Sequence, residues 1–314
     1  MIRGTTAPAV LLVANQGDRS LSIIDPVAGV QVATVAESGV TGHEVIASPD
    51  GRIAFVPIYG DSGVGRPGTD GNTMDVIDIG SRKILHVIDF GHGVRPHCPI
   101  YDPVYGKLYV TTEIDETVTI LDPGSYNIVG FIPTGQVQSH MLAITHDGRR
   151  GYTANVGPGT VSVLDLRAQK TIAIIAISGQ TQRISISNDD KMVFTADQTS
   201  PRLAVIETST NQVASWVTLP APGYGTASST DGRKLLVTIP SLNKVAVVDL
   251  QSLKVERTID VPAHPTEVLL RPDGQVAYVS CGASGQVAAI DLSQWKVEKI
   301  INAGKGADGL AWSP

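Results

Sequence analysis

The sequence predicts an all-β fold, a seven-bladed β-propeller with four antiparallel strands in each blade. Three observations predict it: a repeat of about 42 residues, runs of Val, Ile, Ala and Thr interrupted by Gly and Pro, and a C-terminal segment that completes the repeat begun at the N-terminus. A fixed period of this length is typical of propellers, in which each repeat is one blade packed around a common axis.

The composition agrees with many short strands joined by tight turns. The 314 residues include 32 glycines and 19 prolines, while only 17% are charged and 5% are aromatic. Strands favour β-branched residues, and turns favour Gly and Pro. Because all-β domains often reach this length, residues 1–314 are expected to form a single propeller domain.

Three landmarks recur along the chain in the same order. The first is a second-strand motif of the form Tyr-Val-Thr-Thr, which starts at Leu12, Phe55, Tyr109, Tyr152, Phe194, Leu236 and Tyr278. The second is an acidic residue that ends the third strand, at Asp25, Asp78, Asp122, Asp165, Glu207, Asp249 and Asp291. The third is a turn between the first and second strands, with Asp-Gly at residues 50–51, 147–148, 231–232 and 273–274, a pair that supplies positive φ. Both of the first two landmarks occur seven times, which predicts seven blades.

The two ends of the chain are expected to share one blade. The chain begins at a second strand and finishes with Asp308-Gly-Leu-Ala-Trp-Ser-Pro, which matches the first strand of a repeat. We therefore expect residues 309–313 to pair with the strand around residues 12–15. Such a closure leaves no open sheet edge in the ring.

The motifs Tyr109-Val-Thr-Thr and Tyr152-Thr-Ala-Asn, each followed by an alternating apolar strand that ends in Asp, resemble the YVTN family of β-propeller repeats. The match covers almost the whole chain. This family is similar to lactonase-like propellers, amine dehydrogenase heavy chains and the cytochrome d1 type, many of which are exported. The resemblance implies the propeller fold and a periplasmic or secreted location, but a fold alone does not specify an activity.

Charge and targeting signals restrict the partners. A formal net charge of −6 without a Lys/Arg cluster argues against nucleic acid and anionic membranes. No apolar stretch approaches the roughly 20 residues of a membrane span, and the first residues lack the regions of a signal peptide. A cleaved leader would leave the same sequence, so the compartment stays open. Cys98 and Cys281 fall four blades apart, too far for a disulfide. We expect a monomer that acts on a small molecule.

Ligands of propellers bind at one end of the central channel, so the residue that each blade places at this end is a candidate for ligand binding. Aligning the repeats on the turn places these residues around the ring: Asp308, His43, His97, His140, Gln182, Tyr224 and Thr266. Histidine fills three adjacent positions although only seven of 314 residues are histidine. Three imidazoles predict a divalent metal ion, Zn, Cu or Fe, bound by His43, His97 and His140.

Asp308, next to His43 in the ring, is expected to be a fourth ligand or to orient a ligand imidazole. Its alternative role is a cap at the start of a strand. For the histidines themselves, the alternatives are a metal-free binding or acid/base site and simple lining of a wet channel.

Four further residues are candidates for catalysis. Glu44 and Glu267 come one residue after His43 and Thr266 of the ring. At this offset the side chain should turn toward the gap between blades, where it could support the site or act as a base. Arg183 has the same offset, and together with Tyr224 it could hold an anionic or carbonyl group of the substrate. The alternative for Arg183 is an ion pair between blades.

One blade carries an insertion. The second-strand aromatic precedes the third-strand acid by 13 residues in six blades, as from Tyr109 to Asp122, but by 23 from Phe55 to Asp78. The extra segment, within residues 59–72, is glycine-rich and polar and should emerge on the histidine face. We expect residues 57–73 to form a lid that brings Tyr59, Asp61 or Arg66 near the channel mouth. A plain surface elaboration is the alternative.

These features favour a small-molecule metalloenzyme that carries out hydrolysis, lactone opening or elimination. The alternatives are a copper or iron oxidoreductase at the same site and a non-catalytic propeller that binds a protein or a polysaccharide. The chain has no Gly-x-Ser-x-Gly and no His-Glu-x-x-His motif, which argues against a serine hydrolase and a zincin-type protease.

Overall fold

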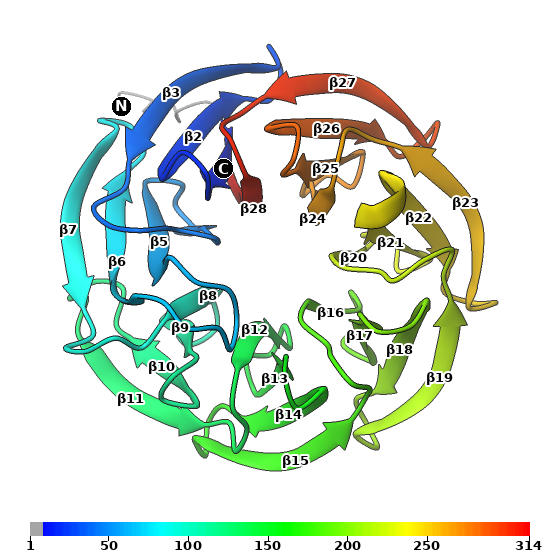
Figure 1. Cartoon of the computed structure of the whole chain (residues 1–314), viewed down its shortest axis with the longest axis horizontal. Coiled ribbons are helices and arrows are strands. Elements are labelled where there is room, and N and C mark those ends of the chain that lie inside the picture. The colour runs from blue at the N-terminus through cyan, green and yellow to red at the C-terminus, as the bar shows by residue number, and fades with distance from the viewer. Residues whose placement is uncertain (1–8) are drawn as a thin grey trace, which may run out of the picture.

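Seven four-stranded antiparallel sheets surround a central channel in the computed structural model, which describes residues 9–314 (Figure 1). The predicted seven-bladed propeller is therefore confirmed. Within the described residues the helical structure is limited to one 3₁₀ turn, η1 (Pro240–Leu242). No helix in that part of the chain is long and apolar enough to cross a membrane.

Each blade runs from an innermost to an outermost strand. Blade 1 comprises β28 (Ala307–Ser313), β1 (Val10–Asn15), β2 (Ser20–Asp25) and β3 (Val30–Ala36). Blade 2 comprises β4 (Ile46–Ala47), β5 (Ile53–Gly60), β6 (Asp70–Asp78) and β7 (Lys83–Asp89). Blade 3 comprises β8 (Pro96–Asp102), β9 (Lys107–Thr112), β10 (Thr117–Leu121) and β11 (Ile128–Pro133). Blade 4 comprises β12 (Ser139–Ile144), β13 (Arg150–Asn155), β14 (Thr160–Asp165) and β15 (Lys170–Ala176).

The remaining three blades follow the same order. Blade 5 comprises β16 (Ile184–Ile186), β17 (Met192–Asp197), β18 (Arg202–Glu207) and β19 (Gln212–Thr218). Blade 6 comprises β20 (Thr226–Ser228), β21 (Lys234–Ile239), β22 (Lys244–Asp249) and β23 (Lys254–Asp260). Blade 7 comprises β24 (Pro265–Leu270), β25 (Val276–Cys281), β26 (Gln286–Asp291) and β27 (Lys296–Asn302).

The ring closes as the sequence predicts. Strand β28 pairs antiparallel with β1, with Leu12 opposite Ala311 and Asn15 opposite Ala307. In Figure 1 the red C-terminal strand accordingly lies inside the blue N-terminal strands. The pairing is slightly longer than expected, because it begins at Ala307 and reaches Val10.

The core lies between the blades. Second strands such as β13 are buried at nearly every position because both of their faces pack against neighbouring sheets. The recurrent aromatic residue of the second-strand motif is fully or almost fully buried wherever it occurs, as Phe55, Tyr109, Tyr152, Phe194 and Tyr278. The motif therefore specifies the packing of the fold.

An acid ends each third strand, and in the six blades where it is Asp its side chain accepts backbone N–H groups of the next turn. Asp25 accepts the backbone N–H groups of Val27 and Ala28, each at 2.9 Å, and Asp165 does the same for Arg167 and Ala168. This is an Asx turn, which a short carboxylate forms readily. The fourth residue after the acid has positive φ in all seven blades: Gly29, Arg82, Tyr126, Gln169, Asn211, Leu253 and Trp295. The acid thus has a structural role.

The closure generates a stability prediction. Leu310 of β28 is 4% exposed and packs between blades 7 and 1, so Leu310→Ala should lower the free energy of unfolding by about 2–5 kcal/mol. Val27→Ala is the matched control, because Val27 is 85% exposed and should change stability by less than about 0.5 kcal/mol. Chemical denaturation monitored by tryptophan fluorescence measures both, and equal stabilities would contradict the role of β28.

Candidate functional site

The pairing of several innermost strands is interrupted at the end that lies at the channel. Register shifts occur between Pro96 and Pro99 in β8, between Ser139 and Met141 in β12, and between Pro265 and Val268 in β24. A β-bulge leaves the extra residues unpaired and redirects their side chains. These breaks contain the ring positions of blades 3, 4 and 7, and a similar break in β28 contains Asp308.

The structure brings together the three predicted histidines, here called the histidine centre (His43, His97 and His140). The ring centroids of His97 and His140 are 3.5 Å apart, and those of His43 and His97 are 5.4 Å apart. All three side chains are buried, with residue exposures of 8% for His43 and 2% for the other two. Burial, the largest cause, lowers the pKa of each imidazole, to about 4 for His43, so all three are neutral near pH 7.

The hydrogen bonding of the histidine centre is incomplete. His43 Nε2 lies 2.9 Å from Gln16 Nε2, whereas the Nδ1 atoms of His97 and His140 are buried without a hydrogen-bond partner. Buried polar atoms are usually paired, so two orphaned nitrogens in one cluster require an explanation. Across residues 9–314, however, no group of three or more His, Cys, Asp or Glu side chains is arranged to hold a metal ion.

Of the predicted lid residues, Tyr59 is the one that reaches the histidine centre. Tyr59, at the end of β5, is fully buried, and its ring centroid lies 4.8 Å from that of His43, 5.3 Å from that of His97 and 5.7 Å from that of His140. The other two lid residues expected at the mouth, Asp61 and Arg66, instead belong to the loop between β5 and β6. There Asp61 accepts the backbone N–H of Thr69.

Two buried charged residues of blade 3 anchor this loop, and the sequence analysis did not identify them. Arg95 donates to the backbone oxygens of Gly63 and Arg66 at 3.3 and 2.7 Å. Glu113 accepts the hydroxyl of Tyr59 and the backbone N–H of Gly65, the latter at 3.2 Å. The only signal in the sequence was that both lie at the ends of blade 3 strands, on the face where the insertion emerges.

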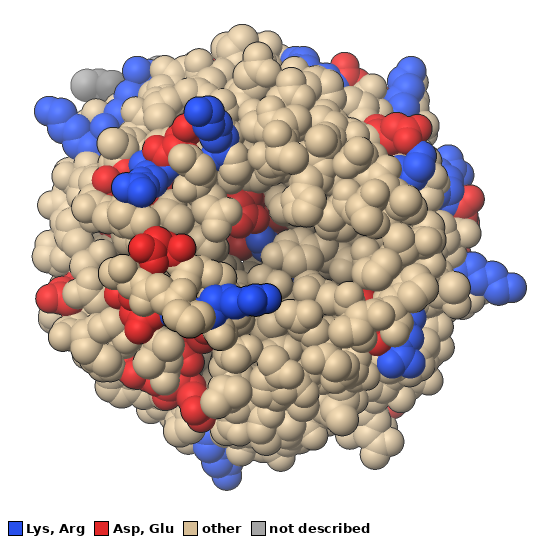
Figure 2. Space-filling model, in the orientation of Figure 1, with Lys and Arg blue, Asp and Glu red and all other residues tan. Residues whose placement is uncertain are grey.

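A second group of predicted residues meets across the channel and is here called the arginine cluster (Arg183, Glu44, Glu267 and Asp308). Arg183 Nη2 donates to Asp308 Oδ1 at 2.7 Å, and Nη1 lies 2.7 Å from Glu44 Oε1 and 3.8 Å from Glu267 Oε2. These partners belong to blades 1, 2 and 7, so the blade 5 guanidinium spans the channel. Figure 2 shows acidic and basic groups within the central hollow of one face.

The remaining predicted residues also contact Arg183. Asp308 binds Arg183 directly. The guanidinium carbon of Arg183 lies 5.3 Å from the ring centroid of Tyr224, a cation–π contact. Arg183 thus makes the ion pairs between blades that were the alternative expectation. Glu44 and Glu267 point to the channel rather than only to the gap between blades.

Burial dominates the protonation of these carboxyl groups. It raises the pKa of Glu44 well above its ordinary value and that of Glu267 to about 7, with Arg183 acting in the opposite direction. Burial alone would lower the pKa of Arg183, but the carboxylates hold it above its ordinary value. The cluster therefore keeps its cation and can exchange a proton on a carboxyl group near neutral pH.

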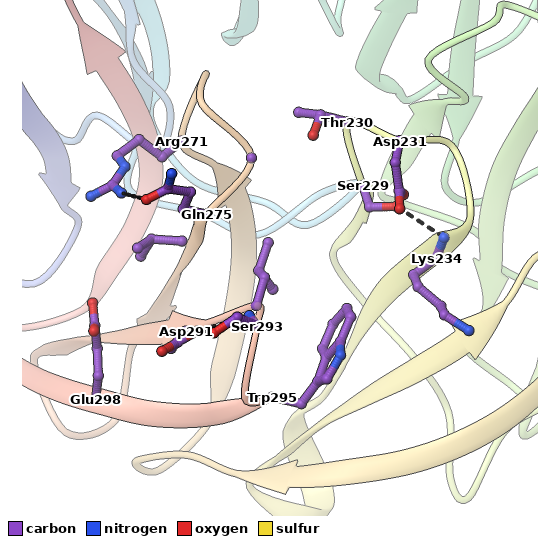
Figure 3. A pocket seen from close by; sticks show the side chains of 13 residues that line it. Ser229, Thr230, Asp231, Lys234, Arg271, Gln275, Asp291, Ser293, Trp295 and Glu298 are labelled. Carbon is purple, nitrogen blue, oxygen red and sulfur yellow. Dashed lines mark hydrogen bonds between the residues drawn. The ribbon is translucent and has the colours of Figure 1, made fainter.

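A groove of about 540 Å³ lies elsewhere, between blades 6 and 7 on the side of the Asp-Gly turns (Figure 3). Its cations already have partners: Lys234 Nζ is 2.8 Å from both Asp249 Oδ2 and Glu256 Oε1, and Arg271 Nε is 2.8 Å from Asp273 Oδ1. Because these charges are paired within the protein, the groove is a gap between blades rather than a second candidate site.

The raised pKa of Glu267 predicts a pH effect on stability. Between its ordinary pKa of 4.5 and about 7, the folded protein holds a proton that the unfolded chain releases, so the contribution of Glu267 to stability declines as pH rises through this window. Glu267→Gln should remove that decline, which we expect to be about 1–3 kcal/mol between pH 5 and 8. Denaturant unfolding at both pH values measures it.

Glu298→Gln on the exposed face of β27 is the control, and its pH profile should match that of the parent. A Glu267→Gln profile that also runs parallel to the parent would contradict the assignment.

Comparisons with known proteins agree on the fold. A family model described as the cytochrome D1 heme domain matches residues 105–225, which include His140 and Arg183 but neither His43 nor His97. The solved structure of Kuenenia stuttgartiensis hydrazine synthase is similar with a TM-score of 0.78 and 18% identity, over 93% of this chain and 99% of that chain. No curated protein matches the sequence. These findings support a propeller without singling out the YVTN or lactonase-like propellers.

Proposed function

We propose that the histidine centre binds one divalent transition-metal ion and that this propeller is an enzyme acting on a small molecule at its channel mouth. The observation that carries the proposal is the meeting of three buried imidazoles, in which Nδ1 of His97 has no polar partner and Nδ1 of His140 has only the Glu113 carboxylate, at 3.6 Å. Neutral imidazole is the form that binds metal ions. Because the rings of His97 and His140 face each other at 3.5 Å, they must rotate apart to bind a common ion.

The chain supplies the groups that a ligand imidazole needs around it. Glu113 Oε2 lies 3.6 Å from His140 Nδ1, where a carboxylate can fix the tautomer and orientation of the ring. Burial opposes ionisation of Glu113, but the nearby His140 imidazole and the hydrogen bond from Tyr59 hold its pKa below the ordinary value. Tyr59 lies against all three imidazoles and excludes water from them.

A bound ion would supply Lewis acidity for hydrolysis, lactone opening or elimination. Among the residues expected to take part in catalysis, Glu267 is best suited to transfer a proton, because its pKa of about 7 is near the working pH. Arg183, Glu44 and Tyr224 hold the arginine cluster together, so we assign them a supporting role in this reaction. Asp308, bound to Arg183, lies outside the proposed ligand set.

Redox chemistry is a second candidate because residues 105–225 match the cytochrome D1 heme domain. The described site does not fit a haem group. Tyr59 is fully buried against the imidazoles, and a distance of 3.5 Å between the ring centroids of His97 and His140 leaves no space for a planar macrocycle between them. We therefore derive no step through haem, and copper or iron bound by the histidines is the redox alternative.

Elemental analysis of untagged protein, followed by titration of the metal-free protein with Zn²⁺ and Co²⁺, tests the proposal. We expect one ion per chain, and replacement of any of the three histidines by Asn should weaken binding about tenfold or more because a ligand is lost. His146→Asn is the control, since His146 is 61% exposed and pairs with Asp190 at the Asp-Gly turns.

The identity of the ion separates the hydrolytic from the redox alternative. Purified protein without metal that also fails to bind either ion would refute the proposal and favour a non-catalytic binding propeller.

A further inference from the structure

Glu113 occupies an unusual position between two parts of the molecule. It follows the last residue of β9 and is 3% exposed. Its Oε2 atom accepts the Tyr59 hydroxyl and lies 3.6 Å from His140 Nδ1, while Oε1 accepts Gly65 N–H at 3.2 Å and lies 3.5 Å from Arg95 Nη1. One carboxylate thus contacts the inserted loop, its arginine anchor and the histidine centre.

The loop depends on these contacts because it is polar and rich in glycine. Gly65 has a φ of +64°, a backbone conformation that residues with a Cβ rarely adopt, and it lies against the end of the Gln138 side chain in the connection to blade 4. Arg95 fixes the same segment through the oxygens of Gly63 and Arg66. Residues 63–66 are therefore held to blade 3 by two buried charged side chains.

A cavity of about 360 Å³, open to the surface, borders this segment. It is lined by loop residues 65–67, by Arg95 and Glu113 of blade 3, and by residues of the following connections such as Ile114 and Gln138. Glu113 is a wall of this cavity and also the neighbour of His140. Of the groups that line the cavity, it is the one in direct contact with the histidine centre.

We propose that Glu113 is a positioning residue that couples the inserted loop to the histidine centre. While the loop is closed, the Glu113 carboxylate accepts the Tyr59 hydroxyl and the Gly65 N–H and lies 3.6 Å from His140 Nδ1, close enough to favour the Nδ1–H tautomer, so the loop position and the tautomer of His140 are linked. A small molecule in the cavity reaches the histidines when it replaces the Tyr59 hydroxyl and the Gly65 N–H as hydrogen-bond donors to Glu113. The molecule must therefore carry hydroxyl or amino groups. The role of His140 as a ligand rests on the proposed function, whereas the coupling itself does not.

The experiment compares Glu113→Gln and Glu113→Ala with the parent, all without metal. Hydrogen exchange followed by mass spectrometry reports the loop: in Glu113→Ala the exchange of peptides covering residues 61–69 should become about tenfold faster or more, because the Gly65 N–H loses its acceptor. ¹⁵N NMR of the imidazoles reports the site: His140 should be the Nδ1–H tautomer in the parent and shift toward Nε2–H in Glu113→Gln. A merely structural role would leave the tautomer unchanged.

Glu116→Gln is the matched control, since Glu116 lines the same cavity, is exposed and makes no contact with His140 among the described interactions. It should leave both measurements at parental values. Unchanged loop exchange in Glu113→Ala, or an unchanged His140 tautomer in Glu113→Gln, would overturn the coupling. Failure of the parent to bind Zn²⁺ or Co²⁺ would refute the proposed function without affecting either measurement.

Discussion

The pairing of β28 with β1 is the constraint on which the rest of the molecule depends. This pairing joins the two ends of the chain in blade 1, and hydrogen bonds such as those from Gln16 N–H to Gly306 O at 3.0 Å and from Gly304 N–H to Asn15 Oδ1 at 2.9 Å reinforce it. The same strand also reaches the channel: Asp308 binds Arg183, and the backbone N–H of Leu310 donates to Glu267 at 2.6 Å. Closure and the arginine cluster therefore form together.

The charges inside the channel are balanced by different means in its two groups of residues. In the arginine cluster one guanidinium faces three carboxyl groups, and the raised pKa values of Glu44 and Glu267 reduce the excess negative charge. Removing one partner of a buried ion pair commonly costs several kcal/mol because the other charge is left without compensation. In the histidine centre burial keeps the imidazoles neutral, so no counterion is needed.

Periodicity made much of this structure predictable. The seven blades, the closure and the ring positions follow from a repeat that each blade satisfies independently, and the three histidines do lie together at the channel. The contacts between remote segments were not predictable in this way. Arg183 and Asp308 are 125 residues apart, and their pairing depends on how the ring brings opposite blades within reach.

The bulges explain a second difference from expectation, which is the direction of the glutamate side chains. A regular strand would direct Glu267 away from the neighbouring ring residue, whereas the break in β24 allows both of two adjacent side chains to face the channel, and Glu44 precedes β4 and so is not bound by the strand alternation. The repeat did not predict Glu113 and Arg95, because they lie next to strand ends, where the residue types differ between the repeats. Their importance arises from an insertion that a single blade carries.

The same bulges separate what the channel can bind from what keeps the fold stable. Because residues at these breaks leave the strand ladder, blades 1, 3, 4 and 7 can direct adjacent side chains toward the channel. These positions form a lining that differs from blade to blade, with imidazoles in blades 3 and 4, Glu267 in blade 7 and Asp308 in blade 1. A propeller built this way can acquire a new specificity through evolution one blade at a time.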